Sequence, residues 1–162
     1  MSVVEQEQFK RVIGHFASGV SIITVHNSGV DFGITASAVC SVSVEPPMLL
    51  VCINKNAGTC HAIAAAGSFT VNIMNQTQKD LALQFAKPNT DKFKGVAFGY
   101  GELGHPVLND TLAHLECRVV EEVTGGTHSV FLAKVQNAYS SIGEPLVYYR
   151  GKFGEFKEVS FK

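Results

Sequence analysis

The chain has 162 residues, of which 46% are hydrophobic and 17% are charged, and its formal net charge is -1. This composition is typical of one folded domain, taken here as residues 1–162, and it argues against an intrinsically disordered chain. The charges are scattered, so the sequence indicates neither a nucleic-acid-binding surface nor a helix that lies on a membrane.

The N-terminal residues are polar and acidic, unlike a secretory signal peptide, and the longest wholly apolar run, residues 48–53, is far shorter than the roughly 20 residues that span a bilayer. The four cysteines are well separated and show neither disulfide nor zinc-ribbon spacing. Free thiols are typical of a reducing compartment, so we expect a cytoplasmic protein. The six histidines also lack metal-ligand spacing, and we expect no metal site.

The first predicted elements are a helix and a hairpin. Apolar residues at positions i, i+3, i+4 and i+7 predict an amphipathic helix over residues 5–17, which Gly19 ends. Two segments rich in β-branched residues flank the turn residues 27–29, and they predict a hairpin with strands over residues 20–25 and 30–35.

The next stretch, residues 33–47, is neutral and rich in small side chains and hydroxyls. Alternating hydroxyl and apolar residues predict a strand over residues 41–44 with one polar and one apolar face. Residues 35–38 carry no bulk, so a flat ligand could approach their backbone closely. Taken alone, however, the stretch is more simply interpreted as a small-residue strand packed under a helix.

The rest of the chain combines apolar strands with two helices. A strand buried on both faces is predicted over 48–53, followed by a helix through Ala66 that Thr59 or a neighbour caps and Gly67 ends. A strand over 69–73, a helix over 78–86 and a loop over 87–104 come next. Two long strands over 112–123 and 128–139 flank a Gly125-Gly126 turn, and a strand over 146–149 closes the domain. About seven strands in hairpin order favour an antiparallel barrel over a doubly wound sheet.

Two segments are candidates for phosphate binding. Residues 53–59 lie between a predicted strand and a helix start, where free N–H groups attract an anion and where Lys55 and Thr59 could complete the site. A loop with a threonine cap explains the same residues equally well. Residues 99–104 spell G-x-G-x-x-G, but His105-Pro106 follows instead of an opening helix, which favours a plain loop.

Several segments, taken in order, carry a resemblance to one family. They are residues 16–20, 33–38, 41–47, 67–73, 81–86, 104–108, 113–117, 126–128 and 145–148. Together they resemble the short-chain flavin reductases, the FMN-binding split-barrel family that includes the reductase components of two-component flavin monooxygenases. The match runs in register over nearly the whole chain.

The resemblance implies an all-β fold with short helices, a six-stranded antiparallel Greek-key split barrel that works as a homodimer with each flavin near the subunit interface. It implies an NAD(P)H:flavin oxidoreductase, which passes a hydride from NADH or NADPH to FMN or FAD and supplies reduced flavin to a partner monooxygenase. The alternatives are a flavin-bound reductase of a ferric chelate or a cobalt corrinoid, and a non-catalytic flavin- or haem-binding barrel.

The resemblance also implies the site residues. Flavin would be held by Thr35, Ala36, Ser37, Ala38, Ser41, Val42, Ser43, Cys52, Asn54, Lys55, Gly58 and Thr59, with its phosphate on the loop of residues 54–59. His128 and Tyr148 would lie at the flavin face where nicotinamide stacks, with His128 positioning the rings rather than transferring a proton. The family usually has Ser in place of Gly58 and often Asp in place of Thr127, so a backbone N–H is expected to replace one phosphate-binding hydroxyl.

Overall fold

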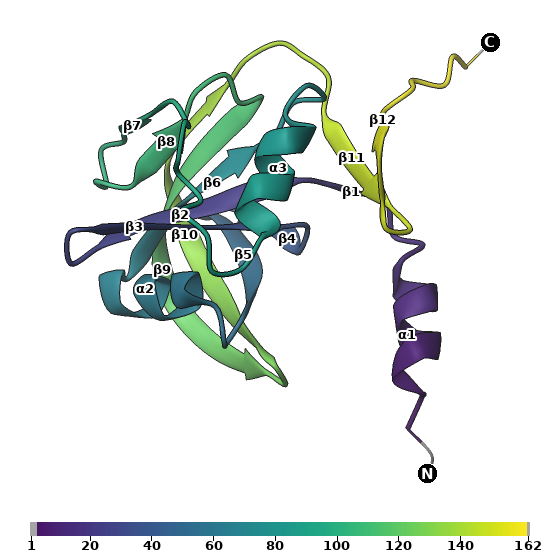
Figure 1. The fold of residues 1–162 in the computed structure, drawn as a ribbon, viewed down its shortest axis with the longest axis horizontal. Coiled ribbons are helices and arrows are strands. Elements are labelled where there is room, and N and C mark those ends of the chain that lie inside the picture. Colours follow the sequence, from purple (N-terminus) through teal and green to yellow (C-terminus); the bar gives the residue numbers. More distant parts are fainter. Residues whose placement is uncertain (1–2, 162) are drawn as a thin grey trace.

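A computed structural model describes residues 3–161, and its largest part is an antiparallel sheet with helices packed against it (Figure 1). Within these residues the sheet has seven strands in the spatial order β3-β2-β6-β9-β10-β5-β4. The bounds of these strands are β2 Ser21–Asn27, β3 Val30–Ala36, β4 Val39–Val44, β5 Pro47–Asn54, β6 Ser68–Ile73, β9 Ala113–Gly125 and β10 His128–Ser140. Smaller sheets join β1 Ser18–Gly19, β11 Leu146–Tyr149 and β12 Lys152–Glu155, and pair β7 Phe98–Tyr100 with β8 Pro106–Leu108. The helices are α1 Gln6–Ile13, α2 Gly58–Ala66 and α3 Lys79–Ala86.

Turn residues set both hairpins that the sequence predicts. Ser28 and Gly29 have φ values of 51° and 79°, as a two-residue I′ turn requires, and they join β2 to β3. Gly126, with a φ of 61°, turns the chain from β9 into β10. Both hairpins are confirmed, and the predicted strand ends lie within about two residues of the observed ones.

The strand-dominated, antiparallel fold class is also confirmed, although the resemblance implied a barrel of six strands. The main sheet has seven strands in the described residues, as the sequence pattern suggested, and the predicted strand at residues 41–44 is β4, which pairs with β5 as an outer strand. In residues 3–161 the two outer strands, β3 and β4, are not paired with each other, so closure of the sheet into a barrel stays a prediction.

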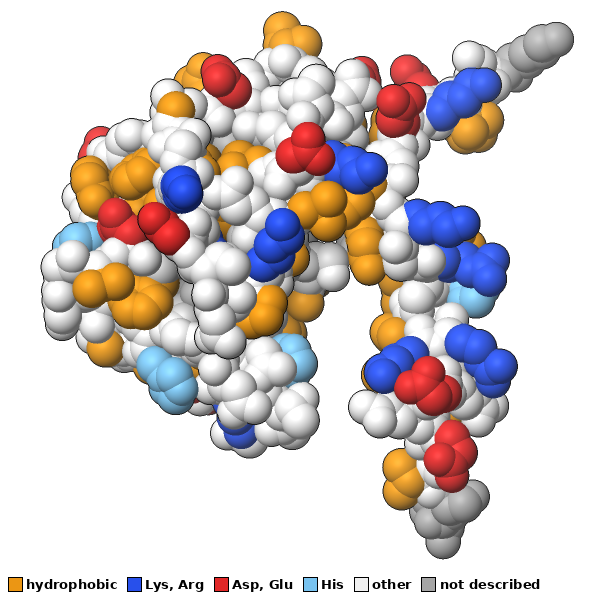
Figure 2. Space-filling model, in the orientation of Figure 1, with side chains coloured by type: hydrophobic (Ala, Val, Ile, Leu, Met, Phe, Trp, Pro, Cys, Tyr) orange, Lys and Arg blue, Asp and Glu red, His pale blue; other side chains and the backbone are white. Residues whose placement is uncertain are grey.

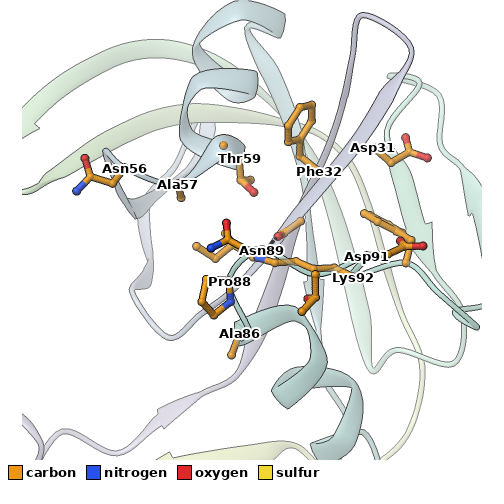
Figure 3. A pocket seen from close by; sticks show the side chains of 15 residues that line it. Asp31, Phe32, Asn56, Ala57, Thr59, Ala86, Pro88, Asn89, Asp91 and Lys92 are labelled. Atoms are coloured by element: carbon orange, nitrogen blue, oxygen red, sulfur yellow. Dashed lines mark hydrogen bonds between the residues drawn. The ribbon is translucent and has the colours of Figure 1, made fainter.

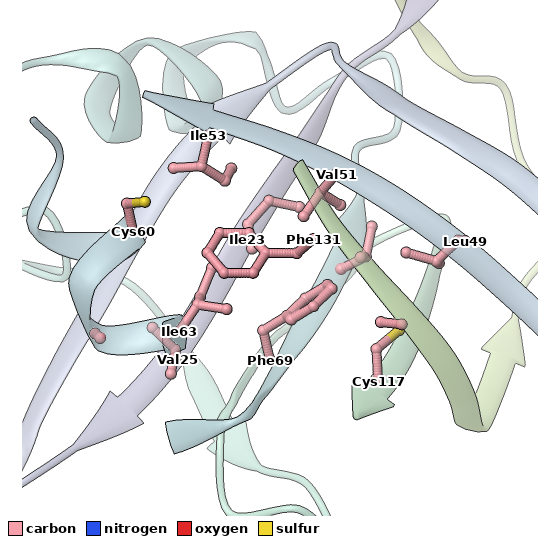
Figure 4. Close-up of a cluster of buried hydrophobic side chains, with 13 residues drawn as sticks. Ile23, Val25, Leu49, Val51, Ile53, Cys60, Ile63, Phe69, Cys117 and Phe131 are labelled. Carbon is pink, nitrogen blue, oxygen red and sulfur yellow. The ribbon is translucent and has the colours of Figure 1, made fainter. Parts of the chain in front are cut away.

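Burial of β2 from both sides positions two helices. Ile23 lies in a buried cluster with Ile63 of α2 and Phe131 of β10 (Figure 4). Its neighbour Ile22 belongs to a second cluster, which includes Phe85 of α3. Because burying each of these side chains stabilises the fold by about 1.5–3 kcal/mol, α2 and α3 are held firmly against β2.

Two predicted elements at the N-terminal end and in β5 need correction. The first helix ends at Ile13 instead of reaching Ala17, and Ser18 and Gly19 pair with β11 as β1. The strand predicted to be buried on both faces is β5, and its residues alternate between buried and partly exposed. One face packs on the core, whereas the other carries Cys52 and faces away from it.

Three further expectations are only partly right. Gly67 ends α2 with a φ of 69°, as predicted, but Ala57 is the N-cap of α2 without a side-chain hydrogen bond, and Thr59 lies inside the helix. Residues 98–100 form β7 within the predicted loop, and β12 follows the strand that was expected to be last.

Among the residues described, no helix is long and apolar enough to cross a membrane.

An arm made of α1, β1, β11 and β12 extends away from the main sheet (Figures 1 and 2). Every residue of α1 is exposed, including Phe9 and Val12 with exposed fractions of 55% and 66%. The apolar face that predicted this helix therefore does not meet the body of its own chain.

Candidate ligand-binding site

A small cavity of about 200 Å³ opens where β3 ends, beside β5 and the start of β10. The sheet brings these distant segments together: the N–H of Cys52 donates a hydrogen bond to the carbonyl of Ala38 at 3.0 Å, and Asn54 lies opposite His128 in the β5–β10 pair. The predicted site residues that line this small cavity are Thr35, Ala36, Ser37, Ala38, Cys52, Asn54 and His128.

Apart from His128, the small cavity is lined by side chains without a formal charge. Burial raises the pKa of the Cys52 thiol, and the neighbouring Cys40 raises it further, so the thiol keeps its proton. Nδ1 of His128 lies 2.9 Å from the hydroxyl of Thr127, which carries no charge. Small side chains and accessible backbone with few polar groups suit a flat, uncharged ligand with polar edges.

Thr35 has a structural contact that the sequence did not predict. Its hydroxyl donates a hydrogen bond to the carbonyl of Ala82 in α3 at 2.6 Å. The side chain therefore ties β3 to α3, and the hydroxyl proton of Thr35 is not available to a ligand.

A larger cavity of about 500 Å³ lies between β3, the start of α2 and the loop of residues 86–93 (Figure 3). Both cavities are lined by Ile34, so they adjoin along β3, and together they fall within the roughly 300–1,000 Å³ typical of ligand sites. The predicted phosphate residues Gly58 and Thr59 line the larger cavity. Because α2 begins there without a side-chain cap, its first N–H groups are left for a ligand or water.

The larger cavity also contains a cation that the sequence prediction missed. The Nζ of Lys92 donates a hydrogen bond to the carbonyl of Gly33 at 2.9 Å, and burial lowers the pKa of the Lys92 ammonium. In Figure 3 the loop that carries Lys92 faces Thr59 of α2 across the cavity. The available signal was weak: three lysines in a predicted loop, one of them followed directly by Phe93.

Gly33 allows β3 and α3 to approach closely behind the larger cavity. A Cβ at this position would lie 2.5 Å and 2.6 Å from two ring carbons of Phe85 and 3.5 Å from Phe93. A glycine is therefore needed here for space, which places the loop after α3 against the strand that lines both cavities.

A polar network fixes Asp31 in the wall of the larger cavity. One carboxylate oxygen lies 2.7 Å from Nδ1 of His26, and the other accepts a hydrogen bond from the Tyr100 hydroxyl at 2.7 Å. This hydrogen bond raises the pKa of Tyr100. Behind the network, the backbone N–H of His26 donates a hydrogen bond to Nδ1 of His105, and burial lowers the pKa of the His105 imidazole.

Five predicted site residues line neither cavity. Ser41, Val42 and Ser43 lie on β4, where the pairing with β5 is irregular and the residues are largely exposed. Lys55 lies in the β5–α2 loop, and its N–H donates to the Thr127 carbonyl. Tyr148 lies in the arm, opposite Ser18 and against the ring of Phe153.

The part of the chain that the structure describes contains no group of three or more His, Cys, Asp or Glu side chains that could hold a metal ion. The cysteines Cys40, Cys52, Cys60 and Cys117 are all free thiols.

Comparison with known proteins gives matches over most of the chain. The family model described as "Flavin reductase like domain" matches residues 13–157. The reductase component of a 4-nitrophenol 4-monooxygenase/4-nitrocatechol 2-monooxygenase from Rhodococcus opacus is 48% identical over 153 residues, which cover 94% of this chain and 82% of that protein. A flavin reductase (NADH) from Kitasatospora aureofaciens is 33% identical over 95% of this chain and 83% of that protein. The solved structure of the NADH:FAD oxidoreductase SgcE6 from Streptomyces globisporus C-1027 matches with a TM-score of 0.89 and 33% identity, covering 98% of this chain and 99% of that one.

Proposed function

The chain belongs to the family of flavin reductase like domains, and from this membership we propose that it is an NAD(P)H-dependent flavin reductase. It takes a hydride from a nicotinamide nucleotide, passes it to a flavin and supplies the reduced flavin to a monooxygenase. The small cavity carries the proposal, because it is lined by six of the predicted flavin-binding residues and by His128, which come from separate segments of the chain.

The residues of the small cavity fit the flavin ring. When bound, the flavin supplies the electron acceptor for the hydride. The chain holds the ring with the backbone of residues 35–38, gives it a neutral wall at Cys52, and offers polar groups at Asn54 and His128. The first N–H groups of α2, at Gly58 and Thr59, hold the ribityl phosphate.

We assign His128 a positioning role, because it borders the small cavity from the start of β10 and its near partner is the neutral Thr127 hydroxyl. Ser41, Val42, Ser43 and Lys55 are proposed as outer contacts of the flavin. Tyr148 lies on the arm and lines neither cavity of its own chain, so a second copy of the chain would have to bring it to the site.

A homodimer is proposed for this reason and for a second one. The apolar face of α1, with Phe9, Val12 and Ile13, is exposed in the single chain, and Tyr149 of the arm is exposed as well. Covering such a face with a second copy would remove a large apolar surface from water.

The four free thiols support a location in the reducing cytoplasm.

The activity is tested by mixing the purified protein with NADH or NADPH and with FMN or FAD, and by following the loss of nicotinamide absorbance. We expect oxidation well above the protein-free rate. Ala38→Trp, which fills the small cavity, should weaken flavin binding at least about tenfold, whereas Val30→Trp, on β3 but outside both cavities, should not. A rate equal to the protein-free rate with both flavins would overturn the proposal.

A further inference from the structure

We propose that the β7–β8 hairpin, residues 98–108, is an acid-released strap across the main sheet (Figure 1). The loop end of this strap stays closed on the sheet while His105 is neutral, and it lifts when His105 binds a proton. Residues 98–108 line neither the small nor the larger cavity, so the proposal goes beyond the proposed function.

The sheet surface under the strap is buried but polar. Residues that lie opposite each other on neighbouring strands share one face of a sheet. The pairs on the face that the strap contacts are Asp31 with His26, Thr24 with Thr70, and Thr70 with Glu116. Thr24, Thr70 and Glu116 are at most 3% exposed. Because this face offers few apolar contacts, hydrogen bonds have to hold the strap on it.

The two ends of the strap are held differently. At its base, Phe98 and Leu108 pack in the buried cluster that includes Phe85 of α3. At its loop end, the N–H of Leu103 donates a hydrogen bond to a carboxylate oxygen of Glu116 at 2.9 Å. The loop end therefore depends on polar contacts, and it can open locally while the base stays packed.

His105 is the buried contact at the loop end, with an exposed fraction of 3%. Its Nδ1 accepts a hydrogen bond from the backbone N–H of His26 at 2.9 Å, so Nδ1 carries no proton. Its Nε2 lies 2.7 Å from the Ser68 hydroxyl and carries the one ring proton of a neutral imidazole. In the closed strap His105 is therefore neutral, and both of its ring nitrogens bind the sheet.

A second proton on the His105 ring is incompatible with the closed strap. It would sit on Nδ1 and face the N–H of His26, so two donors would meet and the hydrogen bond would be lost. Burial also disfavours the charged ring and lowers the pKa of His105. In the open strap the ring reaches water and titrates near its ordinary value of 6.5, so acid favours the open form.

Charged groups on the neighbouring strands act on His105 in both directions. Glu116 of β9 and Asp31 of β3 raise its pKa, whereas His26 of β2 and Arg118 of β9 lower it. Both carboxylates already accept hydrogen bonds from other groups. Burial is the largest influence, and the pKa of His105 is lowered overall.

The strap itself carries two further titratable side chains, and both bind the sheet. The Tyr100 hydroxyl donates a hydrogen bond to Asp31 at 2.7 Å, and a carboxylate oxygen of Glu102 accepts one from the Asn137 amide of β10 at 2.9 Å. When the loop end lifts, Asp31 loses the Tyr100 contact. Acid release of the strap therefore reaches the wall of the larger cavity, which Asp31 lines.

The test is hydrogen–deuterium exchange of the full-length protein at about pH 7.5 and about pH 5, with rates corrected for the intrinsic effect of pH. Opening of residues 101–105 should increase roughly ten- to thirtyfold at the lower pH, as a histidine that titrates near 6.5 only in the open form requires. Strands β2 and β6 should keep their protection.

Two variants and one spectrum make the test specific. His105→Asn keeps an acceptor for the His26 N–H but does not titrate in this range, so exchange of the strap should no longer respond to pH. His61→Asn removes an exposed histidine from α2 and should respond like the wild type. Nitrogen NMR of the wild-type His105 ring should show an unprotonated Nδ1 at neutral pH and a midpoint below 6.5.

The proposal is overturned if Nδ1 of His105 carries the proton at neutral pH, or if the strap exchanges equally at both pH values. It is also overturned if His105→Asn responds to pH as His61→Asn does, because another group would then control the strap. Loss of protection in β2 and β6 together with the strap would refute it as well, since the whole domain would then unfold in acid.

Discussion

Gly33→Ala is the substitution that most directly tests how the site is assembled. The added Cβ would meet the Phe85 ring at 2.5 Å and 2.6 Å, well inside normal contact distance. The ring is fully buried and cannot move away without moving α3. Gly58→Ala is the matched control, since its Cβ would lie 3.4 Å from the Phe32 ring, an ordinary contact.

The expected magnitude follows from these distances. Overpacking of a filled core lowers the free energy of unfolding by about 1–3 kcal/mol. Replacing glycine by alanine raises it by about 0.4–1 kcal/mol, because alanine reduces the conformational entropy of the unfolded chain. We therefore expect Gly33→Ala to lower the free energy of unfolding by roughly 1–2 kcal/mol, or the Tm by about 2–8 °C in a chain of this size. Gly58→Ala should leave stability unchanged or slightly raised.

Urea unfolding followed by circular dichroism measures both variants. Phe85→Leu is added to test the contact itself, because a smaller side chain makes room for the new Cβ. The loss of unfolding free energy in the double variant should be smaller than the sum of the losses in the two single variants, by about 0.5 kcal/mol or more. Equal urea midpoints for Gly33→Ala and Gly58→Ala, or strict additivity with Phe85→Leu, would refute the reasoning.

Two further predictions concern Lys92 and the arm. Because burial lowers the pKa of Lys92, its positive charge is lost below the ordinary value of 10.5. The affinity of the larger cavity for inorganic phosphate should therefore fall as the pH rises toward that value, whereas Lys92→Arg should bind phosphate evenly over the same range. A wild-type midpoint at or above 10.5 in calorimetric titrations would contradict this. Phe9→Asp places a charge on the exposed apolar face of α1 and should shift the sedimentation mass from dimer toward monomer, whereas Gln8→Asp adds the same charge beside that face and should not; a monomeric wild-type protein would exclude the proposed dimer.

Sequence patterns predicted best what depends on neighbouring residues. The hairpin turn at Gly29 and the helix end at Gly67 follow from local backbone conformation, and both are observed. The family resemblance identified most residues of the small cavity, although no periodicity in residues 35–38 pointed to a ligand. The burial of β5 was overestimated, because an apolar run does not reveal that only one of its faces meets the core.

The larger cavity was harder to predict because its walls come from distant segments. Lys92 and Gly33 are 59 residues apart, and a lysine in a polar loop looks solvent-exposed until the loop is placed against β3. The contact between Thr35 and Ala82 has the same origin. Such contacts depend on the packing of α3, which no short window of sequence contains.

The hydrogen bond between Lys92 and Gly33 has a consequence beyond ligand binding. β3 is an outermost strand of the main sheet, and an uncovered strand edge can recruit a strand from another molecule and start aggregation. The lysine occupies a main-chain carbonyl of that edge, and its charge opposes the approach of a foreign strand. The loop after α3 thus hinders the pairing of β3 with a strand from another molecule.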